Sequence, residues 1–277
     1  MRWRTTPFVA RGGRRAARLK MMFGDATRQG WGYRLRLVAP QVLTGSRVVF
    51  GAAAVITALD GRLYPAAVLI TFGAVTDVLD GLLARRLGVA GPFGALFDTF
   101  TDYFCFVIAP WALTRAIVAP GGGVILETLI GLPLLTGAVR YARNSLLIVA
   151  AAGEVRELPG LATVFFAFLP VAAVFLDAPA LVGEPRLPAL MTFLVVTFSL
   201  LMVTSLSYPK LNSFRWLPAP VLVASLAAMP FLGTRILAGV MLVAGLLYVA
   251  FAHLLTRGRP GARRMTTASA RPATRRH

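Results

Sequence analysis

Charged residues are scarce in this sequence. Only 14% of its 277 residues are Asp, Glu, Lys or Arg, whereas about 25% is usual in a soluble domain, and 57% are apolar. There is one cysteine, Cys105, which excludes an intramolecular disulfide and a cluster of cysteine metal ligands. This composition excludes an intrinsically disordered chain and argues against a soluble enzyme.

Acidic residues are nearly absent from the two ends of the chain, where the positive charge gathers. Residues 1–37 contain ten Arg or Lys and the single acid Asp25, and residues 257–277 contain seven Arg and no acid. The net charge of +18 lies mainly in these ends, and the region 38–256 is close to neutral. Arg and large apolar residues mix within 11–37, which predicts an amphipathic helix on an anionic membrane surface. We expect 257–277 to be disordered, and membrane lipids, not nucleic acid, to be the partners of both ends.

Long runs without any charged residue fill the region between the basic ends. Four of them lie at 158–176, 187–209, 216–234 and 236–256, each close to the roughly 20 residues that cross a bilayer as a helix. No alternation typical of membrane β-strands is present, so helices must satisfy the backbone hydrogen bonds. We predict an all-α integral membrane protein with about eight transmembrane helices. They are expected at about 38–58, 64–84, 96–118, 124–148, 160–177, 188–207, 218–233 and 235–256.

The basic residues beside these spans predict the orientation of the chain. Cytoplasmic loops of membrane proteins are rich in Lys and Arg. Both basic ends are therefore expected in the cytoplasm, which requires an even number of spans. Six spans would also satisfy this condition but would leave two apolar runs unused. We expect a multi-pass protein of the cytoplasmic membrane.

Four aspartates lie at the facing ends of the second and third predicted spans, where charges are costly and usually functional. Spacings of three and four residues put each pair on one face of a helix. Both pairs can line one cavity at the cytoplasmic edge, where a hard divalent cation, Mg²⁺ or Mn²⁺, would relieve their repulsion. Helix-end acids paired with Arg47, Arg85 and Arg86, or a cation pathway of a transporter, are the other interpretations. The four acids are Asp77, Asp80, Asp98 and Asp102.

The spacing of the whole segment 77–102 resembles a known signature. The segment reads Asp77-x-x-Asp80-Gly81-x-x-Ala84-Arg85, then eight residues, Gly94, three, Asp98, three, Asp102. This pattern is similar at every defined position to that of the CDP-alcohol phosphotransferase family, whose members transfer a phosphatidyl or related group from a CDP-activated lipid to an alcohol and release CMP. The resemblance implies two divalent ions held by the four aspartates, with Asp102 also the general base for the acceptor hydroxyl.

The same resemblance implies a site for the CDP-lipid. Gly81, Ala84 and Gly94 would leave room for the nucleotide, and Arg85 would hold a phosphate through parallel hydrogen bonds. Thr44 and Arg47 resemble the T-x-x-R element of the family's first helix, which faces that cavity. An Arg47 side chain that reaches the interface to contact water is the alternative for this residue.

Three further segments resemble those of phosphatidylserine synthases. Asp102-Tyr-Phe-Cys-Phe-Val-Ile-Ala-Pro110 is similar to D-x-x-S-F-G-x-A-P, with departures at Cys105 and Val107. Arg140-Tyr-Ala-Arg-Asn144 resembles R-L-A-R-F-N with its Asn one residue early, and Leu158-Pro-Gly160 resembles a following G-L-P turn. The segment from Leu201 to Lys210 resembles L-M-V-S…P-x-x-K. The resemblance implies L-serine as acceptor, CDP-diacylglycerol or an ether-linked counterpart as donor, and a homodimer.

Basic residues near these segments suit an anionic acceptor. The carboxylate of L-serine can pair with Arg140, Arg143 or Lys210, and Asn144 can add a neutral hydrogen bond. The same arginines could instead bind the phosphate of glycerol 3-phosphate or inositol phosphate, or merely follow the positive-inside rule. The acceptor therefore stays open between these alcohols at the level of sequence.

Overall fold

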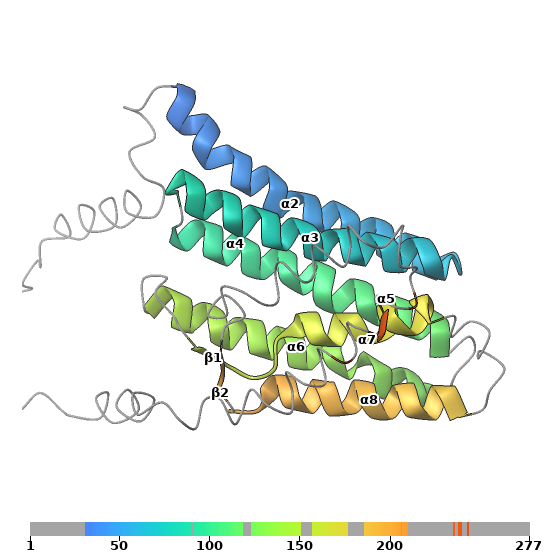
Figure 1. Ribbon diagram of the computed structural model, residues 1–277. Coiled ribbons are helices and arrows are strands. Elements are labelled where there is room, and N and C mark those ends of the chain that lie inside the picture. The colour runs from blue at the N-terminus through green and yellow to red at the C-terminus, as the bar shows by residue number, and fades with distance from the viewer. Residues whose placement is uncertain are drawn as a thin grey trace, which may run out of the picture.

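The computed structural model describes residues 31–89, 91–118, 123–150, 157–176, 186–205 and 207–209 and positions 235, 238, 239 and 243. Within these residues the helices lie side by side in a bundle (Figure 1). The elements are α2 (Trp31–Leu59), α3 (Leu63–Leu87), α4 (Pro92–Tyr103), a π-helical turn η1 (Phe104–Ile108), α5 (Ala109–Val118), α6 (Val124–Ala150), β1 (Glu157–Pro159), α7 (Thr163–Phe175), α8 (Arg186–Val203) and β2 (Ser207–Pro209).

Three of the described helices contain segments long and apolar enough to cross a membrane: Val38–Leu59, Leu63–Leu87 and Val124–Ile148. These segments coincide with the expected spans 38–58, 64–84 and 124–148. The third expected span, 96–118, lies in α4, η1 and α5, which follow one another without a break. The apolar stretches of α7 and α8 are shorter, Thr163–Phe175 and Pro188–Val203. The expected spans 218–233 and 235–256, the interfacial helix up to residue 30 and the tail 257–277 lie outside the described residues, apart from single positions in 235–256.

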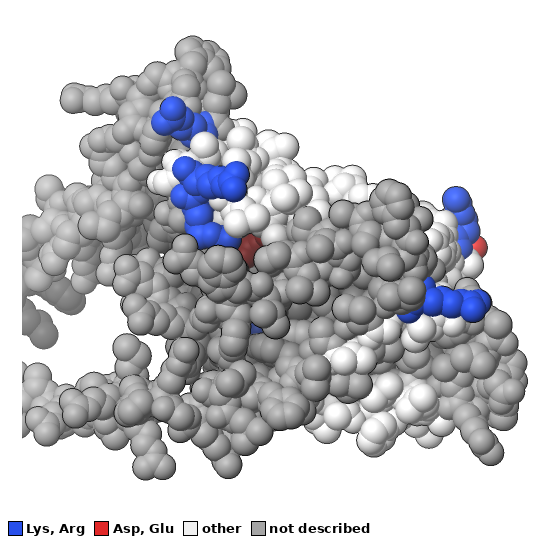
Figure 2. Space-filling model, in the orientation of Figure 1, with Lys and Arg blue, Asp and Glu red and all other residues white. Residues whose placement is uncertain are grey.

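The outer surface of the bundle is apolar along the helices. Val49 on α2 is 68% exposed, Leu146 on α6 is 73% exposed and Phe193 on α8 is 66% exposed. The Arg side chains of the described residues that are visible in Figure 2 lie mainly toward the two ends of the face in view. Exposed apolar side chains such as Val49, Leu146 and Phe193 are stable on the outside of a helix bundle where lipid surrounds it.

Glycines bring the neighbouring helices close to the π-helical turn η1. A Cβ atom at Gly51 of α2 would lie 3.1 Å from the Phe104 ring, and one at Gly73 of α3 would lie 2.2 Å from the Cys105 sulfur. A Cβ atom at Gly137 of α6 would lie 3.0 Å from Val107. Small residues allow this close approach between membrane helices. The helical segment α4–η1–α5 is therefore held between α2, α3 and α6.

A short turn places the ends of α3 and α4 at the same end of the bundle. Gly88 closes α3 with a left-handed φ of 64°, and its N–H bonds to the carbonyls of Ala84 and Arg85. Pro92 starts α4, where a missing N–H costs nothing. We call this end of the bundle, which carries both pairs of aspartates, the α3–α4 end.

Two short strands depart from the expected all-α architecture. β1 pairs antiparallel with β2, Leu158 opposite Tyr208. The span expected to start at residue 160 begins instead as α7 at Thr163. The reason is local, because Gly160 has φ +85° and its Cα lies so close to α8 that a Cβ would meet the Met202 carbonyl at 2.1 Å.

Candidate active site

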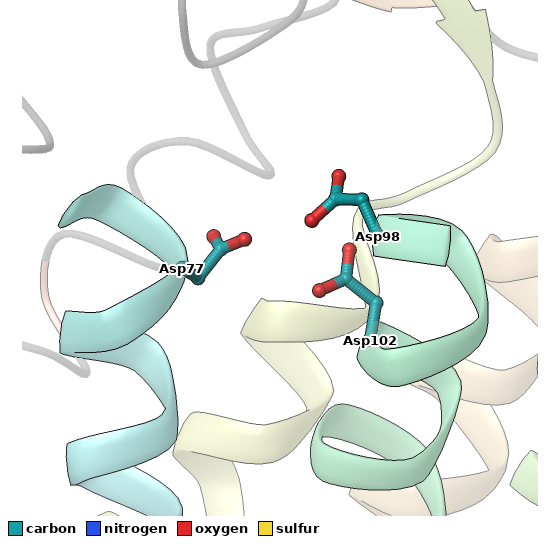
Figure 3. Close-up of side chains that lie close together, drawn as sticks. All are labelled: Asp77, Asp98 and Asp102. Atoms are coloured by element: carbon teal, nitrogen blue, oxygen red, sulfur yellow. The ribbon is translucent and has the colours of Figure 1, made fainter. Parts of the chain in front are cut away.

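Three carboxylates converge at the α3–α4 end. Asp77 comes from α3, and Asp98 and Asp102 come from α4; one oxygen of each lies within 4.8 Å of the others. Figure 3 shows the three side chains pointing toward one another. All three are partly exposed, whereas Asp80, one helical turn beyond Asp77, is 4% exposed. Asp77, Asp98 and Asp102 therefore border one space, as expected, whereas Asp80 is buried.

Arg47 of α2 lies between the four aspartates. Its Nη1 donates to Asp77 Oδ1 at 2.7 Å and also to Asp102, and its Nη2 donates to Asp80 Oδ2 at 2.8 Å and also to Asp98. Arg47 is 0% exposed, so the alternative interpretation, in which its side chain reaches the interface to contact water, is wrong. A buried charge of this kind is stable because opposite charges and hydrogen bonds surround it.

The donor set of this cluster fits a hard divalent cation. One guanidinium faces four carboxylates, which leaves an excess of negative charge in a partly buried site. Carboxylate oxygens are the ligands that Mg²⁺ and Mn²⁺ prefer. Asp77, Asp98 and Asp102 are placed to share such an ion.

Thr44 orients Asp80, the most buried of the four aspartates. Its hydroxyl lies 2.6 Å from Asp80 Oδ2 and 2.9 Å from the Pro40 carbonyl of its own helix. Thr44 and Arg47 are three residues apart on α2, so both reach Asp80 from one helix face. The T-x-x-R element therefore faces the acidic cluster.

Two glycines near the acidic cluster allow polar side chains to lie directly against the helix backbone. A Cβ atom at Gly81 would lie 3.3 Å from Nη1 of Arg85, so the Arg85 side chain folds back over this glycine. A Cβ atom at Gly94 would lie 2.9 Å from Nε2 of Gln41. Ala84, on the same helix as Gly81, is partly buried.

Gln41 of α2 is a candidate site residue that the sequence motifs did not indicate. Its Oε1 is buried and accepts no hydrogen bond from the residues that the structure describes. Gln41 lies three residues before Thr44 on α2, and this spacing on one helix face is the signal that could have identified it.

The inner face of α6 approaches the helix that carries Asp102. The Tyr103 hydroxyl donates to the Leu134 carbonyl at 2.8 Å, and the Tyr103 and Tyr141 rings meet edge to face at 5.8 Å. Beside Tyr141, Arg140 is 6% exposed, and Asn144 is 2% exposed. Two of the predicted acceptor residues, Arg140 and Asn144, are therefore buried on α6, the helix that packs against α4.

Arg143, also a predicted acceptor residue, is placed differently from Arg140 and Asn144. The guanidinium of Arg143 contacts backbone carbonyls, those of Pro159 at 2.8 Å and Val203 at 3.2 Å among them. The Arg143 guanidinium is thus bonded to the backbone of other segments, whereas both Arg140 and Arg143 were predicted to bind the acceptor. Lys210 lies outside the described residues.

Comparison with known proteins gives a consistent result. The sequence profile for CDP-alcohol phosphatidyltransferase matches residues 37–254. The chain is 27% identical over 177 residues to a CDP-diacylglycerol–serine O-phosphatidyltransferase of Helicobacter pylori strain J99, a match covering 64% of this chain and 74% of that protein. It is 28% identical over 181 residues to archaetidylserine synthase of Methanothermobacter thermautotrophicus, covering 64% and 71%. A CDP-diacylglycerol–serine O-phosphatidyltransferase of Methanocaldococcus jannaschii is 30% identical over 159 residues, covering 56% and 69%.

Proposed function

This chain belongs to the CDP-alcohol phosphatidyltransferase family, and on that basis we propose that it transfers the phosphatidyl group of CDP-diacylglycerol to the hydroxyl of L-serine, giving phosphatidylserine and CMP. The observation that carries the proposal is the buried Arg140 beside the helix of Asp102, because a guanidinium there suits an acceptor with a carboxylate. The names of the Helicobacter and Methanocaldococcus relatives support serine as that acceptor.

The four aspartates would hold two divalent cations, Mg²⁺ or Mn²⁺, with Asp77 and Asp98 shared between them. When bound, such ions neutralise the charge of the diphosphate during an in-line displacement. Arg47 fixes the carboxylates through its four hydrogen bonds, and Thr44 fixes Asp80. The aspartates themselves are therefore held in position before substrate arrives.

The remaining residues of the signature would receive the CDP-lipid. Gly81, Ala84 and Gly94 add no bulk beside the nucleotide, and Arg85 would bind a phosphate oxygen. Thr44 and Arg47 would close this site from the side of α2. These roles rest on the family resemblance and on the positions of the residues around the acidic cluster.

The transfer step is a direct displacement. Asp102 would take the proton of the serine hydroxyl, and the serine oxygen would form a bond to the lipid-linked phosphorus. The bond from that phosphorus to the bridging oxygen breaks, and CMP leaves with the electron pair. Arg140 would hold the serine carboxylate so that the hydroxyl points toward Asp102.

The chain is a multi-pass membrane protein of this family, and we propose eight spans with the α3–α4 end and both termini in the cytoplasm. Exposed Arg85 and Arg86 lie at this end, in agreement with the positive-inside rule. A homodimer is proposed from the family resemblance alone.

The test is CMP release by purified protein given CDP-diacylglycerol and Mn²⁺ or Mg²⁺, with one acceptor at a time. Release that depends on L-serine supports the proposal. Release with glycerol 3-phosphate or inositol phosphate only would assign the acceptor to these alternatives, since their phosphates also suit Arg140. No release with any alcohol, from folded protein, would favour the remote alternative of a cation-coupled transporter.

A further inference from the structure

A column of buried polar side chains runs along the inner face of α6. Thr136, Arg140 and Asn144 follow at intervals of four residues, so they lie one above another on one helix face, and they are 7%, 6% and 2% exposed. Polar groups inside a membrane protein are costly and are retained where they have a function or a partner.

The amide oxygen of Asn144 differs in its hydrogen bonding from the two hydroxyls beside it on α6, those of Thr136 and Tyr141. The Thr136 hydroxyl bonds to the Leu132 carbonyl of its own helix at 3.1 Å, and the neighbouring Tyr141 hydroxyl bonds to that of Thr163 at 2.5 Å. Oδ1 of Asn144 is buried and accepts a hydrogen bond from none of the described residues. A buried amide oxygen of this kind requires an explanation, and a donor supplied by a ligand is one.

Asn144 lies at the depth of the acidic cluster. A Cβ atom at Gly137 would lie 3.0 Å from Val107 and 3.4 Å from Tyr103, so α6 approaches η1 and α4 closely at this residue. From Gly137, α6 rises about 10 Å over the seven residues to Asn144, toward the α3–α4 end, and the nine residues from Val107 of η1 back to Asp98 of α4 cover about 13 Å in the same direction. The Asn144 amide and the carboxylate of Asp98 are thus at similar depth in the bundle.

We propose that Asn144 accepts a hydrogen bond from the ammonium group of the acceptor and thereby selects an amino-acid alcohol, an inference that rests on the proposed function. Arg140 holds the carboxylate, Asn144 holds the ammonium one helical turn away, and the hydroxyl is left to face Asp102. A charge-assisted hydrogen bond to the amide oxygen is stronger than one from a neutral hydroxyl. Glycerol 3-phosphate and inositol phosphate carry no ammonium, so they leave this oxygen without its charged partner.

The experiment compares two acceptors that differ only in the ammonium group, L-serine and 3-hydroxypropanoate, by CMP release. The wild-type protein is expected to use serine with kcat/KM about 100-fold higher. Asn144→Leu, which keeps the side-chain size, is expected to lose about 100-fold with serine, mainly through KM, and to change less than about threefold with 3-hydroxypropanoate. Ser199→Ala is the matched control, because Ser199 is a buried polar residue of α8 bonded to its own helix at 2.7 Å.

Three results would overturn the inference: wild-type protein that uses both acceptors equally, an Asn144→Leu variant that loses activity equally with both, or one that keeps its preference for serine. If Asn144→Leu does not fold, Asn144→Ala is measured in its place with the same expectation. Wild-type protein that releases CMP with glycerol 3-phosphate or inositol phosphate but not with serine would overturn the proposed function itself. If wild-type protein uses serine but Asn144→Leu loses activity equally with both acceptors, only the role of Asn144 is overturned.

Discussion

The guanidinium of Arg143 donates a hydrogen bond to the carbonyl oxygen of Pro159 over 2.8 Å and so ties α6 to β1. The same guanidinium contacts carbonyls at the C-terminal end of α8, with Val203 at 3.2 Å. These last carbonyls of a helix lack partners within it and carry partial negative charge, which a guanidinium neutralises. Arg143 therefore acts as a clamp between three segments that are distant in sequence.

We predict that Arg143→Gln reduces stability more than it reduces acceptor binding. Loss of several hydrogen bonds from a charged donor is expected to cost about 2 kcal/mol or more and to lower the melting temperature of the detergent-solubilised protein by about 5 °C. Arg86→Gln is the control, since Arg86 is exposed at the end of α3. A large rise in the KM for serine with no loss of stability would instead place Arg143 on the acceptor.

Thr44→Val is predicted to weaken metal binding without unfolding the protein. Valine keeps the shape of threonine but removes the hydroxyl that lies 2.6 Å from Asp80 Oδ2. Groups that orient metal ligands typically contribute about 10- to 100-fold to affinity or activity. The measurement is the Mn²⁺ concentration that gives half-maximal CMP release.

Thr71→Val is the matched control for this experiment. Thr71 is also buried, on α3, and its hydroxyl bonds to the Ala67 carbonyl of its own helix at 2.8 Å. Equal changes in both variants would show that a general effect of removing a buried hydroxyl, and not Asp80, is responsible.

Asp102→Asn is predicted to abolish CMP release and largely to preserve metal-dependent binding of CDP-diacylglycerol. The amide cannot take a proton from the acceptor hydroxyl, whereas Asp77, Asp80 and Asp98 remain as ligands. Removal of divalent ions by EDTA is expected to abolish both release and binding, with recovery on addition of Mn²⁺. Full activity of Asp102→Asn would exclude Asp102 as the base.

Gly73→Ala is predicted to destabilise the packing of α3 against η1. The added Cβ would lie 2.2 Å from the Cys105 sulfur and 3.8 Å from its Cβ, so only the sulfur obstructs it. Overpacking of this kind costs about 1–3 kcal/mol. The double variant Gly73→Ala/Cys105→Ala is expected to recover most of the loss in a thermal unfolding experiment, because the energies of contacting residues are coupled. If the double variant is as unstable as Gly73→Ala alone, the close contact between Gly73 and the Cys105 sulfur is contradicted.

The sequence by itself determined the class of the protein and the acidic motif. Long apolar runs specify membrane helices because the bilayer requires every backbone polar group to be satisfied within the helix. Spacings such as that from Asp98 to Asp102 specify a shared helix face because the helical repeat is fixed. Both properties depend only on residues close together in the chain.

Tertiary structure decided which groups meet across the bundle. It buried Arg47 between aspartates of α3 and α4, and it assigned Arg140 and Arg143, three residues apart, to different surroundings. The π-helical turn after Asp102 packs closely against Gly73 of α3, and β1 pairs with β2, which is about 50 residues away in the sequence. Spacing along one helix places a side chain on a face, but the partner of that face comes from another part of the chain and is fixed only when the helices pack.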